Sequence, residues 1–88
     1  MSRIIVHRRA VKYLRKLPKP HRERIKKALR ELEGHPLEFP NIKQMLGEWA
    51  GYHRIRTGDI RVIFWFDESE DIVYVDHIGH MGDVYKKG

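Results

Sequence analysis

The chain has 88 residues, enough for a single domain over residues 1–88 with one modest core, because a fold of this size buries only about 60% of the surface that its unfolded chain exposes. It has no cysteine, which excludes a disulfide framework and suits a reducing compartment, so we expect a cytoplasmic protein. Its 18 Lys and Arg residues against 12 Asp and Glu residues give a net charge of +6, which favours a polyanionic partner.

The first predicted element is a short strand. Residues 4–6 are consecutive apolar, β-branched residues, a composition typical of strands. The run is too short for the core of a signal peptide or for a membrane span. We therefore expect no export signal and no association with a membrane.

Two helices are predicted next. From Arg8 onward, apolar residues recur at helical spacing until the Pro-Lys-Pro sequence at residues 18–20 ends the first helix. Pro20 suits the first turn of a second helix, which Gly34 and Pro36 end. The apolar positions of the two helices are Ala10, Tyr13, Leu14 and Leu17, and Ile25, Ala28, Leu29 and Leu32. The outer face of the second helix is basic, and a solvated surface explains that charge as well as contact with a polyanionic partner does.

Residues 35–51 contain two prolines, two glycines and no sustained periodicity. This pattern predicts an ordered connection without a helix or a strand. We expect the connection to pack on the domain through its large apolar side chains, which are Leu37, Phe39, Met45, Leu46 and Trp49.

Residues 52–64, YHRIRTGDIRVIF, form two alternating runs joined by Gly58 and Asp59, a pattern that predicts a β-hairpin. With these two residues in the turn, Arg56 lies directly opposite Arg61, and Arg54 shares their face of the hairpin. Like charges in opposite positions are destabilising, whereas a favourable cross-strand pair contributes about 0.2–1 kcal/mol. The pairing therefore predicts an anionic ligand on this face.

The opposite face of the hairpin is predicted to be buried. Ile55, Val62 and Phe64 lie on it, with Ile55 paired to Val62. His53 alternates into the same face and is expected to be a buried histidine with satisfied hydrogen bonds. Trp65 shares the arginine face if its strand stays regular, where it lines either the site or the groove for a partner.

The last predicted elements are an acidic turn at residues 67–71 and a third β-rich run at residues 72–79. The whole order predicts an α+β fold with two N-terminal helices packed on one face of a small, mainly antiparallel sheet, in the order β-α-α-β-β-β. The other face of the sheet is left for function.

A metal site is suggested only superficially by His77 and His80, which have Asp76 and Asp83 nearby. Residues three apart on a strand point to opposite faces, and a zinc site needs three or four converging ligands. We therefore expect no metal and no cofactor.

The sequence resembles the RelE-type toxins of toxin–antitoxin modules, within the RelE/ParE superfamily, over nearly its whole length. The resemblance lies in AVKYLRKLP of the first helix, IKQMLGEWAGYHRIRTGDIRVIF across the connection and the hairpin, and IGHMGDVY near the end. It implies a RelE-like fold and an RNA endonuclease that cuts messenger RNA in the ribosomal A site. It also implies a cognate RelB-like antitoxin that silences the toxin by wrapping around it.

The resemblance assigns roles to individual residues. Arg54 and Arg56 match positions implicated in orienting bases or phosphate, Arg61 matches a phosphate-contacting arginine, and Tyr85 matches a tyrosine that positions or stacks on the substrate. In metal-free cleavage the 2′-hydroxyl attacks the adjacent phosphorus and the 5′-oxygen leaves. Arginines suit this reaction because they stay cationic and donate bidentate hydrogen bonds to the charged phosphate oxygens. The alternative for Tyr85 is a side chain that closes the end of the core.

Met81 stands where the family commonly has an arginine that is implicated in catalysis. Methionine neither donates a proton nor binds phosphate. His80 is the nearest candidate to compensate, because imidazole serves as an acid or a base near neutral pH and related toxins use a histidine near the C-terminal end. The alternative is that His80 packs at a strand end and that the toxin is weak or inactive.

Two other functions are compatible with the sequence. One is a non-catalytic toxin that binds a protein target, as the ParE branch binds DNA gyrase, and Met81 argues for it. The other is a module that binds RNA without cleaving it. The three retained cationic positions and Tyr85 favour the ribosome-dependent nuclease.

Overall fold

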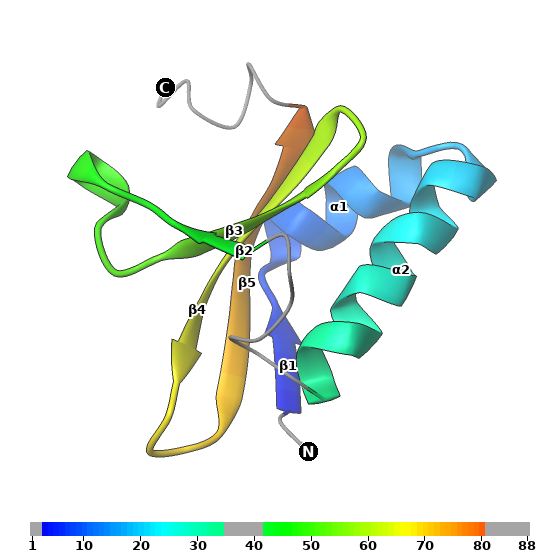
Figure 1. Ribbon diagram of the computed structural model, residues 1–88. Coiled ribbons are helices and arrows are strands. Elements are labelled where there is room, and N and C mark those ends of the chain that lie inside the picture. The colour runs from blue at the N-terminus through cyan, green and yellow to red at the C-terminus, as the bar shows by residue number, and fades with distance from the viewer. Residues whose placement is uncertain (1–2, 35–41, 81–88) are drawn as a thin grey trace.

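The computed structural model describes residues 3–34 and 42–80 of the chain. Its elements are β1 (Arg3–Val6), α1 (Arg8–Lys16), α2 (Lys19–Gly34), β2 (Ile42–Gln44), the short 3₁₀ helix η1 (Gly47–Trp49), β3 (His53–Thr57), β4 (Ile60–Asp67) and β5 (Ile72–His80). The strands form one sheet in the order β1-β5-β4-β3-β2, and both helices lie on one side of it (Figure 1).

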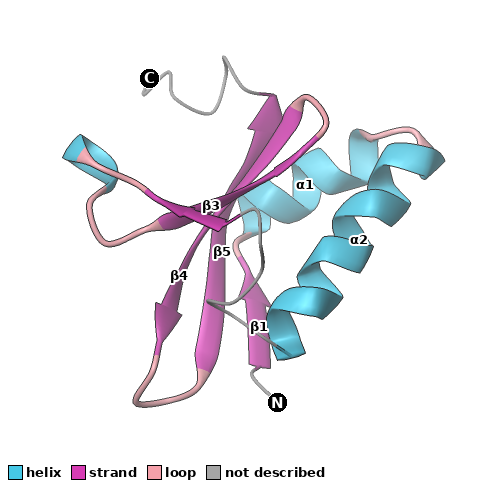
Figure 2. Ribbon diagram, in the orientation of Figure 1, coloured by secondary structure: helices cyan, strands magenta, loops and turns pink. Residues whose placement is uncertain are grey.

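The sheet is mixed but mainly antiparallel. β1 runs parallel to β5, and the other three neighbouring pairs are antiparallel. Figure 2 shows the helical layer on one side of the strands. The predicted α+β fold is therefore confirmed, with one short strand, β2, that the sequence does not predict. Within residues 3–34 and 42–80, no helix is long and apolar enough to cross a membrane.

Both helices begin and end close to the predicted positions. His7 caps α1, because its Nδ1 accepts a hydrogen bond of 3.1 Å from the backbone N–H of Arg9. Leu17 has an extended backbone, as expected for the residue that precedes a proline. Pro20 lies in the first turn of α2, where a missing backbone N–H costs nothing.

The main core lies between the helices and the sheet. α1 contributes Ala10, while α2 contributes Ile25 and Leu32, and all three are fully buried. The sheet contributes residues of three strands, which are Ile55, Ile60, Val62, Phe64, Val73, Val75 and Ile78. Because side chains alternate along a strand, this burial determines which residues of β3, β4 and β5 point away from the helices.

The β3–β4 hairpin has the predicted register. Thr57 pairs with Ile60 across the turn, and Arg56 pairs with Arg61 in the next position. Gly58 begins the turn with a φ of 61°, in the left-handed region that glycine enters without steric cost. The predicted arginine face therefore exists, on the side of the sheet that the helices leave uncovered.

That side of the sheet carries a second, smaller core. Met45, Trp49 and Ile63 are buried together, with Tyr52 packed against them. Ile63 lies directly opposite Arg54, so this cluster adjoins the arginines. The sequence predicts that Met45 and Trp49 pack on the domain, and the structure confirms it.

Other parts of the predicted connection differ from the prediction. Residues 42–44 form the edge strand β2, because their backbone pairs with β3. Leu46 is 83% exposed, so the prediction that it packs is wrong. Leu37 and Phe39 lie outside the described residues.

The pairing of β4 with β5 is irregular between Ile63 and Phe64. Ile63 pairs with His77 but Phe64 pairs with Val75, which leaves Asp76 as an extra residue of β5. The alternation of β4 is unaffected, so Trp65 stays on the arginine side, as predicted for a regular strand. Its ring stacks on Tyr74 at 4.7 Å between centroids.

Candidate nucleic-acid interface

Two like-charged pairs lie side by side on the open face of the sheet. Arg56 is directly opposite Arg61 across the hairpin, as predicted, and Lys43 of β2 is directly opposite Arg54 of β3. Alternation along β3 points Arg54 and Arg56 to the same side. Together Lys43, Arg54, Arg56 and Arg61 form a surface that we call the cationic face.

Sequence reasoning misses Lys43 because it predicts no strand at this position. A strand of three residues, Ile42–Gln44, is too short to reveal a period of two. The β-branched Ile42 is the only local signal within residues 42–44, and it is weak. The strand β2 is therefore defined by its backbone pairing with β3 and not by its own sequence pattern.

The cations of this face differ in their exposure. Lys43 and Arg56 are exposed and Arg54 is half-buried, whereas the side chain of Arg61 is largely covered, at 9% exposure. Arg56 also donates from Nε to the carbonyl oxygen of Gly58 at 3.5 Å. Charge interactions strengthen where water is excluded, so Arg61 is the member of the set best suited to hold a bound anion in a fixed position.

The apolar cluster beside the cations gives this face a rigid border. Trp49 packs edge-on against Tyr52, with 5.2 Å between ring centroids, and edge-on against His77, with 5.1 Å. His77 Nδ1 lies 2.8 Å from Asp76 Oδ2. Asp76 in turn accepts a hydrogen bond from Arg9 of α1 at 3.3 Å. His77 is thus a packed residue that links η1 to the sheet.

His80 does not join the cationic face. It pairs with Ile60 of β4, whose side chain belongs to the core beneath the helices, so His80 projects to the helix side. There its Nδ1 lies 2.5 Å from the hydroxyl of Tyr13 in α1. Arg61, by contrast, pairs with Gly79 and points the other way. The structure therefore separates His80 from the three arginines with which the sequence groups it.

The opposite orientations of His77 and His80 agree with the prediction for a strand. Within the part of the chain that the structure describes, no group of three His, Cys, Asp or Glu side chains could hold a metal ion. Met81 and Tyr85 lie outside the described residues, so their positions relative to the arginines stay predictions.

His53 faces the helix side, as predicted, and stacks on Phe64 with 5.7 Å between ring centroids. Its hydrogen bonds differ from the prediction. Across residues 3–34 and 42–80, Nδ1 of His53 is buried without a hydrogen-bond partner. Desolvation by burial lowers the pKa of His53 from its ordinary value. His53 therefore lies on the helix side and is not part of the cationic face.

The fold, a mixed sheet covered by two helices on one side, is similar to that of solved RelE-type toxins. The archaeal RelE–RelB complex from Pyrococcus horikoshii gives a TM-score of 0.80 at 27% identity, covering 92% of this chain and 96% of that one. The RelBE2 toxin–antitoxin complex from Mycobacterium tuberculosis gives a TM-score of 0.79 at 24% identity, covering 90% of this chain and 96% of that one. YafQ from Escherichia coli gives a TM-score of 0.80 at 15% identity, covering 98% of this chain and 100% of that one, and this likeness shows the fold alone.

The family follows from the sequence model that matches residues 4–85, described as the ParE toxin of the type II toxin–antitoxin system parDE. The chain belongs to this family and, with its RelE-like structure, to the RelE/ParE superfamily of toxins of type II toxin–antitoxin modules. A comparison with curated proteins found no match.

Proposed function

We propose that this toxin is a ribosome-dependent endoribonuclease that cleaves messenger RNA in the ribosomal A site and so inhibits translation. The observation that carries the proposal is the cationic face, where Lys43 lies opposite Arg54 and Arg56 lies opposite Arg61. Like charges in opposite positions repel each other, and an anion that binds between them relieves the repulsion. A messenger phosphate is the anion that fits a planar guanidinium pair.

In the proposed reaction the 2′-hydroxyl loses its proton to water as its oxygen bonds to the adjacent phosphorus, the bond from phosphorus to the 5′-oxygen breaks, and the 5′-oxygen takes up a proton. Negative charge develops on the phosphate oxygens, and fixed guanidiniums donate hydrogen bonds to it without reorganising. Arg61 is assigned to this charge because it is largely covered and therefore held in position. Arg54 and Arg56 orient the flanking nucleotides, and Tyr85 stacks on or positions the substrate. The proposed chemistry requires no metal and no cofactor.

The proposed mechanism requires a proton donor for the 5′-oxygen. His80 is the proposed donor: in the imidazolium form its Nδ1–H donates to the hydroxyl oxygen of Tyr13, and Nε2 carries the proton that passes to the 5′-oxygen. Because His80 projects to the helix side, it reaches the reacting phosphate only if the RNA passes around the Gly58–Asp59 turn. If the RNA stays on the cationic face, His80 is a packed residue and the toxin is weakened by Met81.

The proposed protein partner is a cognate RelB-like antitoxin, and the proposed location is the cytoplasm. The solved relatives from P. horikoshii and M. tuberculosis are toxin–antitoxin complexes, which supports such a partner here. The net charge of +6 favours an acidic, amphipathic antitoxin segment that covers the basic surface.

A second candidate is a ParE-like toxin that acts on DNA gyrase without cleaving RNA. The family model that matches the chain carries the ParE description, which is the observation in its favour. Programmed ribosomes and purified gyrase separate the two functions: cleavage of A-site messenger RNA with no effect on supercoiling supports the nuclease. Inhibition of gyrase without cleavage supports the ParE-like toxin, and ribosome binding without either supports an inactive homologue.

A further inference from the structure

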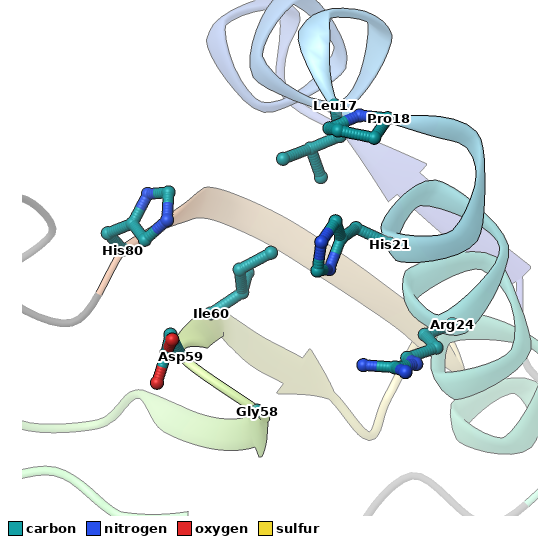
Figure 3. Close-up of a pocket in the computed structure, with 8 residues that line it drawn as sticks. All are labelled: Leu17, Pro18, His21, Arg24, Gly58, Asp59, Ile60 and His80. Atoms are coloured by element: carbon teal, nitrogen blue, oxygen red, sulfur yellow. The ribbon is translucent and has the colours of Figure 1, made fainter.

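A pocket opens on the helix side of the sheet, at the opposite surface from the cationic face. Its volume is about 390 Å³, within the range of about 300–1,000 Å³ that is usual for small-ligand sites. Leu17, Pro18 and Ile60 supply its apolar lining. In Figure 3, α2 and the turn of the hairpin lie on opposite sides of this space.

Four polar side chains also line the pocket: His21 and Arg24 of α2, Asp59 of the turn and His80 of β5. Among the described residues, the side chains of His21, Arg24 and Asp59 make no hydrogen bond or ion pair with one another or with their surroundings. His80 alone is held, by the hydroxyl of Tyr13. The pocket thus combines an apolar lining with the His80 ring, which Tyr13 holds, and with a cation, a carboxylate and the His21 ring, whose hydrogen-bonding capacity is unused among the described residues.

We propose that this pocket binds one nucleotide of single-stranded RNA. The base occupies the apolar space and packs against the imidazole rings of His21 and His80, since aromatic side chains stack on unpaired bases. Arg24 donates hydrogen bonds to the phosphate. Asp59 accepts a hydrogen bond from an amino group on the base edge.

The carboxylate of Asp59 selects among ligands. An acidic peptide would bring a second carboxylate toward Asp59 and meet repulsion, whereas a nucleotide offers an anion to Arg24 and a donor to Asp59 at the same time. Adenine, guanine and cytosine carry an exocyclic amino group. Uracil has carbonyl oxygens on both sides of its single N–H, and these oxygens repel a carboxylate. The site therefore prefers an amino-bearing base to uracil.

The location of the pocket connects it to the proposed RNA substrate, on which this inference rests. The turn residues Gly58 and Asp59 border the pocket, and the next pair of the hairpin toward the sheet, beyond Thr57 and Ile60, is Arg56 with Arg61. A single strand held on the cationic face reaches the pocket by passing around this turn. The pocket then holds a nucleotide that flanks the one bound by the arginines.

Nuclear magnetic resonance on the full chain tests the site without ribosomes. Ring signals of His21 and His80 are followed during titration with adenosine monophosphate, uridine monophosphate and inorganic phosphate. We expect saturable shifts with adenosine monophosphate, at an affinity at least about tenfold above that of inorganic phosphate because the base adds stacking. Uridine monophosphate binds more weakly than adenosine monophosphate.

Variants on the surface of the pocket make the test specific. Arg24→Ala is expected to lower the affinity for adenosine monophosphate by about tenfold or more, because it removes a charge-assisted hydrogen bond. Arg30→Ala, an exposed arginine further along α2, is the matched control and leaves the affinity unchanged. Asp59→Asn removes the preference over uridine monophosphate, because an amide both donates and accepts.

Three results would overturn the proposed nucleotide site. They are no saturable shift of the ring signals with adenosine monophosphate, equal affinities for inorganic phosphate and adenosine monophosphate, or an unchanged affinity for adenosine monophosphate in Arg24→Ala. Shifts produced by a glutamate-rich peptide and not by a nucleotide would also overturn it, in favour of a protein ligand. Because the titration involves no cleavage, its failure leaves the proposed function of the cationic face intact. Conversely, loss of that function leaves nucleotide binding measurable.

Discussion

Lys43 and Arg54 lie directly opposite each other in the register of β2 and β3, so the edge strand extends the cationic face beyond the hairpin. The same register directs Ile42 to the helix side, where it packs on the main core beside Ile55. Burial of Ile42 on one side thus fixes Lys43 on the other. A residue that the sequence assigns to an irregular connection is therefore part of the candidate RNA surface.

Lys43→Ala is expected to lower the rate of messenger cleavage while preserving the fold. The side chain is exposed, so its truncation removes little packing, and relief of a like-charged pair raises the free energy of unfolding by at most about 1 kcal/mol. Cleavage on programmed ribosomes and thermal melting are measured together. Lys27→Ala, an exposed lysine of α2, is the control and should cleave like the wild type.

Arg61→Lys separates charge from geometry on the cationic face. Lysine keeps the positive charge but cannot present two parallel donors to a phosphate, so cleavage should lie between that of the wild type and that of Arg61→Ala. Single-turnover cleavage on programmed ribosomes measures the three proteins. If Arg61→Lys cleaves as fast as the wild type, Arg61 acts only as a point charge and the assigned bidentate contact is wrong.

The stability of the toxin is expected to depend on pH through His53. Burial lowers the pKa of His53 in the folded protein below its ordinary value of 6.5, so the unfolded chain binds more protons as the pH falls below 6.5. The free energy of unfolding must therefore fall with pH in that range. His53→Leu removes this loss and also removes a buried nitrogen without a partner, which costs on the order of 1 kcal/mol.

Denaturant unfolding at about pH 7.5 and about pH 5.5 checks this prediction. The stability advantage of His53→Leu over the wild type should be larger at the lower pH. Equal advantages at both values would show that His53 titrates alike in the folded and unfolded protein. His21→Leu, at an exposed position of α2, serves as the control for loss of a histidine that is not buried.

The proton donor is tested with three substitutions. If His80 donates to the 5′-oxygen, His80→Ala should remove most cleavage and leave antitoxin binding unchanged, and Tyr13→Phe should reduce cleavage by releasing Nδ1. If the site is impaired instead, Met81→Arg should raise the rate, by about tenfold for each 1.4 kcal/mol of recovered transition-state stabilisation, while the other two variants change little. Opposite responses of His80→Ala and Met81→Arg therefore distinguish the two mechanisms.

An acidic antitoxin segment should bind this basic domain in a salt-dependent complex. Co-expression with the neighbouring gene product, followed by purification, tests whether a complex forms. We expect the complex to survive moderate salt and to protect messenger RNA from cleavage, because apolar contacts accompany the charge pairs. A toxin that purifies alone under these conditions would remove the main support for an antitoxin partner.

Local sequence was sufficient for much of the fold. Pro18 and Pro20 delimit the helices, and Gly58 with Asp59 fixes the hairpin register, because these residues act through their own backbone. The opposed arginines followed directly from that register. Two features depend on tertiary contacts and could not be predicted from local sequence. These are the pairing with β3 that makes residues 42–44 a strand, and the extra residue Asp76 that shifts the β4–β5 register.

The candidate site was predictable only in part for the same reason. Alternation correctly put Arg54, Arg56 and Arg61 together, but the covering of Arg61 depends on packing that no periodicity reveals. Plain alternation from the core residues Val73 and Val75 directs His80 to the arginine side, and the extra residue Asp76 reverses this. Neither local sequence nor the resemblance to RelE-type toxins therefore reveals that His80 lies on the helix side.

Arg61→Ala tests whether the cationic face stabilises the transition state of messenger cleavage. Ribosomes programmed with a defined A-site codon are incubated with wild type and with Arg61→Ala, whose folding is verified by its melting transition. The proposed mechanism predicts cleavage by the wild type and a loss of about 100-fold or more in the variant, as for removal of a preorganised donor. Full-rate cleavage by a folded Arg61→Ala protein, or no cleavage by the wild type, would contradict it.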